Sequence, residues 1–140
     1  MDSSLQLRIA IATNSLGRAG AGHSMRVKLL AAHQHGFQGV EISMDCLAHH
    51  AGLDQFAVWE ARADRLLAAA ADLSNTAKSL SLEIMALNPL GALDSLMDTF
   101  DLVESLKEAE LWLQICNVMK CPMLLVSSLA LVLCILNSTY

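Results

Sequence analysis

Residues 7–13 read LRIAIAT, and this stretch is the first indication of how the chain folds. Leu7, Ile9 and Ile11 alternate there with smaller or polar residues, which is the two-residue period of a β-strand. Glycine, serine and asparagine gather immediately afterwards, in residues 14–22, so a loop is expected to follow. The chain is therefore predicted to begin with a strand that runs into a glycine-rich turn.

A helix and a second strand are predicted after this turn. Ser24 stands where a helix N-cap belongs, and Gly36 stands where a helix ends in a left-handed residue. Residues 39–44 (GVEISM) are again strand-like. On the same grounds we expect helices over residues 56–77 and 93–111, and strands over residues 82–87 and 123–127.

Strands and helices thus alternate along the sequence. At roughly thirty to forty residues for each strand and helix, the spacing is that of right-handed crossover connections in a parallel sheet. The 140 residues leave room for a single domain of this α/β class. Two architectures share the order: a doubly wound open sheet, and part of an eight-unit (β/α)8 barrel.

The composition narrows the class of function. Hydrophobic residues make up 54% of the chain and charged residues 16%, so a disordered chain is not expected. Nine basic against fourteen acidic residues leave a net charge of -5, which disfavours nucleic acid as a partner and favours a small molecule or a protein. The four cysteines lack the spacing of a disulfide scaffold and no signal peptide opens the chain, which predicts a reducing, cytoplasmic location.

Two residues near the first two predicted strands are candidates for a functional site. Glu41 is a carboxylate in an apolar strand, and it points either outward against a helix or inward to the polar mouth of a barrel. His23 lies on the loop after the first strand, where α/β proteins place groups that contact ligands. It is either a structural turn residue or a substrate contact.

Two weaker patterns point to other ligands. Gly20 and Gly22 imitate part of a dinucleotide-binding fingerprint, but its third glycine is missing. Cys46, His49 and His50 carry atoms suited to zinc, but no second pair with matching spacing completes a site.

Two further segments are interpreted as structural. The acidic positions of the third helix are expected to form a solvated face; they are Asp94, Asp98, Asp101, Glu104 and Glu108. Residues 123–136 are nearly all apolar, but at about fourteen residues they fall short of the roughly twenty that span a bilayer. A buried strand or helix is favoured there over a membrane or partner-binding tail, and no membrane span is expected.

Six short motifs carry a likeness to a known family, and the likeness covers about residues 7–127. They are SLGR at 15–18, GHS at 22–24, HGF at 35–37, GVEI at 39–42, ALNPL at 86–90 and LWLQIC at 111–116. With these motifs the chain resembles the sugar phosphate isomerase/epimerase family of xylose isomerase-like TIM barrels. Within that family the likeness is to the fungal 3-dehydroshikimate dehydratases of quinate catabolism.

The resemblance implies a lyase that dehydrates 3-dehydroshikimate to protocatechuate. It also implies a divalent metal, Mg²⁺ or Mn²⁺, acting as a Lewis acid on the enolate that forms. Glu41 on the second strand would then face the site as a catalytic residue. Arg18 and His23, on the first loop, would bind the substrate: Arg18 its carboxylate, through a planar fork of donors, and His23 a hydroxyl.

The chain is expected to be only the N-terminal part of such a barrel, because a whole one takes about 250 residues. Residues 1–128 are assigned to the barrel and residues 129–140 to an apolar tail unlike the family. The family's metal-binding carboxylates and catalytic base come from later strands, so no metal ligand is expected here and the isolated chain is expected to be catalytically incomplete. Open sheet edges predict self-association. The alternatives are a sugar phosphate isomerase/epimerase-like protein and a non-catalytic binding or interaction module.

Overall fold

The computed structural model describes residues 8–53, 59–89 and 102–125. Its four strands lie side by side in chain order, and all three neighbouring pairs are parallel. The strands are β1 (Ala10–Ala12), β2 (Gly39–Ser43), β3 (Glu83–Asn88) and β4 (Met123–Leu124). The helices are η1 (Thr13–Leu16), α1 (Met25–Gln34), α2 (Met44–His50), α3 (Trp59–Ser79) and α5 (Leu102–Met119).

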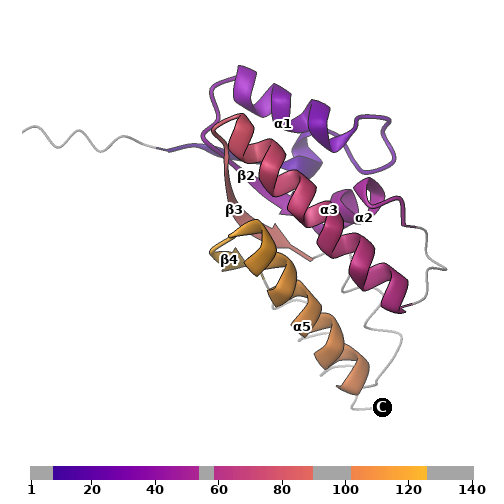
Figure 1. The fold of residues 1–140 in the computed structure, drawn as a ribbon. Coiled ribbons are helices and arrows are strands. Elements are labelled where there is room, and N and C mark those ends of the chain that lie inside the picture. The colour runs from indigo at the N-terminus through magenta and orange to yellow at the C-terminus, as the bar shows by residue number, and fades with distance from the viewer. Residues whose placement is uncertain (1–7, 54–58, 90–101, 126–140) are drawn as a thin grey trace, which may run out of the picture.

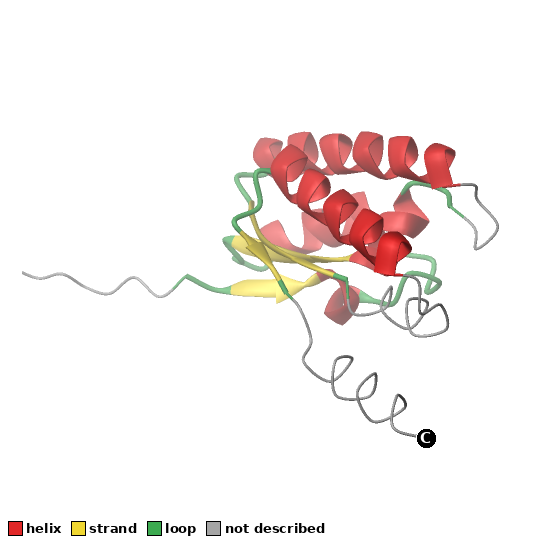
Figure 2. Ribbon diagram, turned by 90° about the horizontal axis from the view of Figure 1, so that it is seen from below, coloured by secondary structure: helices red, strands yellow, loops and turns green. Residues whose placement is uncertain are grey.

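The long helices lie on one face of the sheet. Figures 1 and 2 show α1, α3 and α5 together on the same side of the four strands. A doubly wound sheet instead has helices on both faces and reverses its strand order at a switch point. The predicted α/β class with parallel strands is therefore confirmed, and the arrangement is consistent with a partial repeat of βα units.

The core fills the space between the sheet and these helices. Val40, Ile42 and Leu87 project from the strands, and each is fully buried. Each such side chain contributes about 1.5–3 kcal/mol when its apolar surface leaves water. The helices supply the opposing layer, with Leu29, Leu66, Leu73 and Ile115 fully buried in the same cluster.

All three long helices end in the same backbone motif. Each closes with a hydrogen bond from an N–H to the carbonyl five residues earlier, which is a Schellman motif. These bonds are Phe37 to Ala32 at 3.1 Å, Leu82 to Ala77 at 2.9 Å and Cys121 to Cys116 at 2.8 Å. The residue before each donor has a positive φ: Gly36 at 79°, Ser81 at 55° and Lys120 at 54°. The predicted stop at Gly36 is confirmed.

Most predicted elements are found, with shifted ends and one addition. Ser24 caps α1 as predicted, since its Oγ accepts a hydrogen bond from the Val27 N–H at 3.3 Å. The first strand is shorter than predicted, and its continuation is the 3-10 turn η1. The helix α2 was not predicted, because its seven residues are too few to show a period.

The expectation of a solvated acidic face is wrong for Glu108. The Arg62 guanidinium of α3 donates to both carboxylate oxygens of Glu108, at 2.7 and 2.9 Å, and the Glu108 side chain is only 5% exposed. The cause is the packing of α5 on α3, which turns this carboxylate toward a cation 46 residues earlier in the chain. Asp94, Asp98 and Asp101 lie outside the described residues, as do the side chain of Glu104 and the whole 129–140 tail.

In the ranges that the structure describes, no helix has the length and apolar character needed to cross a bilayer. The boundary placed at residue 128 also falls beyond these ranges and stays a prediction.

Candidate functional site

Glu41 lies on the face of the sheet that the helices leave uncovered. Its neighbours Val40 and Ile42 are buried under the helices, and side chains alternate between faces along a strand. Glu41 is therefore turned away from the helices, and it is half-buried. Its Oε1 accepts a hydrogen bond from the Asn88 Nδ2 at 2.7 Å. Of the two orientations left open for this carboxylate, the structure shows the inward one.

An irregularity in β3 brings Asn88 to this face. Val40 pairs with Ile84, but Glu41 pairs with Ala86, so Met85 is an extra residue in the ladder. Such β-bulges shift every later side chain to the other face and are frequent beside active sites. The bulge places Asn88 on the open face with Glu41.

Gly39 makes room for the extra residue. A Cβ built on Gly39 would lie 2.5 Å from the Met85 Sδ, much closer than atoms of this kind approach. The glycine of the GVEI motif therefore has a packing role: it accepts the Met85 side chain. The pair is a structural precondition for the contact between Glu41 and Asn88.

The carboxyl ends of β1 and β2 are joined by two buried hydroxyls. The Ser43 N–H donates to the Thr13 Oγ1 at 3.0 Å, and the Thr13 hydroxyl donates to the Ser43 Oγ at 3.3 Å. This bond fixes where the loop after β1 leaves the sheet, next to the strand that carries Glu41.

Arg18 and His23 lie on that loop, and both are exposed. The His23 ring packs against Gly17, since a Cβ on Gly17 would lie 3.0 Å from the His23 Cδ2. Neither side chain forms a hydrogen bond or ion pair with any residue that the structure describes, Glu41 included. The fold thus places Arg18 and His23 on the loop beyond the carboxyl end of β1 and Glu41 in the middle of β2, without joining the loop residues to the carboxylate. Their assigned roles stay predictions.

A buried lysine anchors this loop from below. Lys28 is only 2% exposed, and its Nζ donates to the Gly17 carbonyl and to the Cys46 Sγ at 3.2 Å. The Cys46 thiol in turn donates to the Asn14 Oδ1 at 3.1 Å. Sequence reasoning missed Lys28, although it occupies a position on the apolar face of α1 where a lysine is unexpected.

The possible zinc site at Cys46, His49 and His50 does not form. The Cys46 thiol accepts a hydrogen bond from the Lys28 ammonium, and the His50 Nε2 lies 2.9 Å from the Asp72 Oδ2. No three metal-binding side chains converge anywhere in the described ranges.

Asp72 is the centre of a small ion-pair network. The hydrogen bond from His50 lowers the pKa of the Asp72 carboxyl, and the Arg26 guanidinium, 2.8 Å from the other carboxylate oxygen, lowers it further. This network links α1, α2 and α3 on the far side of the sheet from Glu41, so it has a structural role.

The described residues do not supply a full ligand set for the divalent metal that the family resemblance implies. Mg²⁺ and Mn²⁺ take about six ligands, mainly oxygens. On the open face the described residues supply the carboxylate of Glu41 and, at the start of β3, that of Glu83, which is paired with Arg8, and no group of three acidic, histidine or cysteine side chains. The described part of the chain therefore does not form a metal centre. Gly20 and Gly22 lie in the exposed loop before α1, and nucleotide binding there stays a prediction.

Comparison with known proteins gives one informative likeness. The 3-dehydroshikimate dehydratase of Neurospora crassa is 29% identical to this chain over 113 residues, which cover 79% of the chain and 32% of that protein. The chain thus spans about a third of the length of this relative. No family model matches the chain, and no solved structure matches it. The likeness is distant, and it agrees with the resemblance seen in the motifs.

Proposed function

We propose that this chain is the first part of a lyase barrel related to 3-dehydroshikimate dehydratase, with its substrate on the open face of the sheet. One observation carries the proposal: a carboxylate held by an amide at 2.7 Å, on the uncovered face of a parallel sheet. The likeness to the Neurospora crassa enzyme supports the reaction class. Catalytic groups of (β/α)8 barrels come from the carboxyl ends of their strands, where Asn88 ends β3.

The chemistry assigns a role to each group. Dehydration of a hydroxyketone removes a proton next to the carbonyl and expels a hydroxide as water. The Asn88 amide fixes Oε1 of Glu41, and Oε2 has no partner among the described residues, so Oε2 is the oxygen that accepts a proton or hydrogen bond from the substrate. Arg18 would hold the substrate carboxylate and His23 a hydroxyl. The Mg²⁺ or Mn²⁺ expected from the resemblance would need ligands from other residues, and no step is assigned to it.

The two outer strands and the outer sides of α1 and α5 are the surfaces at which further barrel units would pack. Among the strands that the structure describes, β1 and β4 each pair on one side only. The outer flanks of the helix layer are apolar as well: Val27 and Leu30 are exposed on α1, and Leu106 and Leu113 on α5. Monomeric proteins rarely leave both sheet edges and both helix flanks uncovered. These surfaces support a second candidate function, an interaction module that pairs with another copy of the chain or with further barrel units.

The test is protocatechuate formation from 3-dehydroshikimate, with Mg²⁺ or Mn²⁺ added, by the purified chain and two variants. Glu41→Gln removes the charge on the open face and keeps the size of the side chain. Glu110→Gln makes the same chemical change on an exposed position of α5 and is the matched control. Light scattering on the same samples reports self-association.

The proposal expects activity only where self-association supplies the missing half of the barrel, and there a loss of at least about a hundredfold in Glu41→Gln but none in Glu110→Gln, as for removal of a group that handles a proton. Equal activity in both variants would exclude a role for Glu41. Absence of activity in the chain itself, with dimers in solution, would favour the interaction module over the lyase.

A further inference from the structure

A pocket lies at the amino end of β3, away from Glu41. It has a volume of about 370 Å³, within the range of about 300–1,000 Å³ that is usual for small-molecule sites. It opens between the carboxyl ends of α3 and α5 and the first residues of β3. Its floor is apolar, formed by Leu82, Ile84 and Met119.

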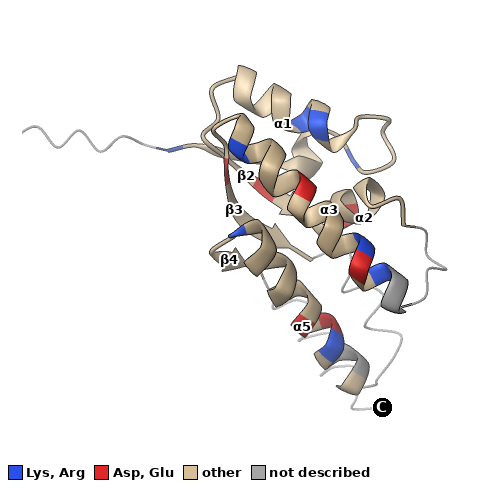
Figure 3. Ribbon diagram, viewed as in Figure 1, with Lys and Arg blue, Asp and Glu red and all other residues tan. Residues whose placement is uncertain are grey.

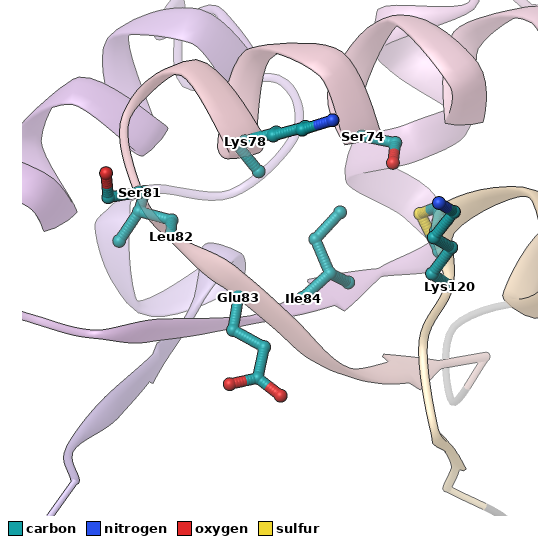
Figure 4. Close-up of a pocket in the computed structure, with 9 residues that line it drawn as sticks. Ser74, Lys78, Ser81, Leu82, Glu83, Ile84 and Lys120 are labelled. Atoms are coloured by element: carbon teal, nitrogen blue, oxygen red, sulfur yellow. The ribbon is translucent and has the colours of Figure 1, made fainter.

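Two lysines and two hydroxyls line this pocket. Figure 4 shows the Lys78 amino group, the Ser74 hydroxyl and the Lys120 amino group along one side of it, above Ile84. The ammonium group of neither lysine forms a hydrogen bond or ion pair with a residue that the structure describes. Figure 3 shows basic segments at these same places, at the end of α3 and in the turn between α5 and β4. The pocket is thus locally cationic in a chain whose net charge is -5.

The acidic residue at the pocket does not cancel this charge. Glu83 is directed away from the lysines in Figure 4, below the β3 ribbon. Its carboxylate accepts a hydrogen bond of 2.6 Å from the Arg8 guanidinium. The two ammonium groups therefore remain available to an anion.

The backbone supplies an independent observation. A helix-ending residue with positive φ is usually glycine, as at Gly36, because a side chain costs about 1 kcal/mol or more in this conformation. At the ends of α3 and α5 the same position is occupied by Ser81 and Lys120, and both line the pocket. Strain that is retained at a binding surface is a recognised mark of a functional site.

A lysine at the carboxyl end of a helix also has an ordinary explanation, because it balances the helix dipole. The dipole does not explain why two such lysines share one pocket with two hydroxyls and an apolar floor. We propose that this pocket binds a small carboxylate that carries an apolar ring. The ammonium groups and the Ser74 hydroxyl would hold the carboxylate, and Leu82, Ile84 and Met119 would contact the ring. Inorganic phosphate would use the cations but not the floor.

The experiment is a titration of the ¹⁵N-labelled chain with benzoate, followed by NMR, with inorganic phosphate as the second probe. Lys78→Gln and Lys120→Gly test the cations. Lys107→Gln, at about 20 Å from Lys120 along α5, makes the same charge change outside the pocket. Thermal melting of each variant is recorded in parallel.

We expect saturable shifts at Ser74, Ser81 and Ile84 with benzoate, and affinity about tenfold lower in each pocket variant but unchanged in Lys107→Gln. We also expect Lys120→Gly to raise the melting temperature by about 2–4 °C, because it relieves the left-handed strain. Three results would overturn the proposal: benzoate shifts that do not saturate, pocket variants that bind benzoate as tightly as the unmodified chain, or inorganic phosphate that binds as tightly as benzoate. None of these outcomes depends on dehydratase activity.

Discussion

The two faces of β2 have opposite characters within five residues. Val40 and Ile42 are fully buried against the helices, whereas Glu41 lies between them on the open face and contacts an amide. The helix-covered face provides the apolar burial that holds the sheet and helices together. The open face contributes a polar pair that this burial does not require. Neighbouring residues of β2 therefore serve different purposes: Val40 and Ile42 stabilise the fold, and Glu41 belongs to the candidate site. The predictions below test this difference, from the largest expected change to the smallest.

The largest expected effect comes from the covered face. Ile42→Ala removes a fully buried side chain and should lower the free energy of unfolding by about 2–5 kcal/mol, measured by urea denaturation. Glu41→Gln, on the neighbouring residue, should change it by less than about 1 kcal/mol, because an amide keeps an oxygen to accept the Asn88 bond. A loss in Glu41→Gln as large as in Ile42→Ala would show that the open face is structural.

The next effect concerns the buried ion pair between α3 and α5. Glu108→Gln removes the buried negative charge of this pair, and we expect a loss of about 2–3 kcal/mol, below the value for fully buried pairs because Arg62 is 26% exposed. The control is Glu83→Gln in the exposed pair with Arg8, where about 0–1 kcal/mol is expected. Equal losses in the two variants would mean that burial does not distinguish these pairs.

A smaller effect tests the bulge that builds the open face. Gly39→Ala places a Cβ against the Met85 sulfur and should cost about 1–3 kcal/mol. Met85→Ala should recover part of this loss in the double variant, because it removes the closest contact and leaves the 3.2 Å approach to the Glu83 carbonyl oxygen. If the double variant shows the sum of the two single losses, the account of the GVEI glycine is wrong.

The smallest effect is a pH dependence on the covered side. The folded pKa of Asp72 lies below its ordinary value of 3.8, so its contribution is present above that pH and is lost as the pH falls below it. Urea denaturation at about pH 6 should show Asp72→Asn less stable by under about 1 kcal/mol, because the carboxylate is 41% exposed. This difference should shrink at about pH 3, and a difference that grows there would contradict the assignment.

Sequence periodicity was sufficient to predict the elements that form the covered face, but it did not predict the arrangement of side chains on the open face. The strands around Ile11 and Val40 and the caps at Ser24 and Gly36 follow from local patterns, and the structure has them. Glu41 was a candidate site residue only because it is a carboxylate in an apolar strand, and the sequence did not identify Asn88 as its hydrogen-bond partner. A uniform alternation from Ile84 onward would put Asn88 on the helix side, and only the bulge, which depends on a contact between Gly39 and Met85, reverses this.

The charged residues show the same limit. The partners of Lys28 and Glu108 lie far along the chain, 18 residues away for Cys46 and 46 for Arg62. Nothing in the local pattern distinguishes a buried charge with a distant partner from a solvated one. Packing of the helices against each other decided both cases.

The most direct test of the central claim is to locate where 3-dehydroshikimate binds. We would titrate the ¹⁵N-labelled chain with this compound and follow the backbone amide signals by NMR. The account predicts saturable shifts at Glu41, Asn88 and the loop of Arg18 and His23, with the buried amides of Val40 and Ile42 shifted less. Shifts confined to the other end of the sheet, around Ser81 and Glu83, or no saturable shift at all, would contradict it.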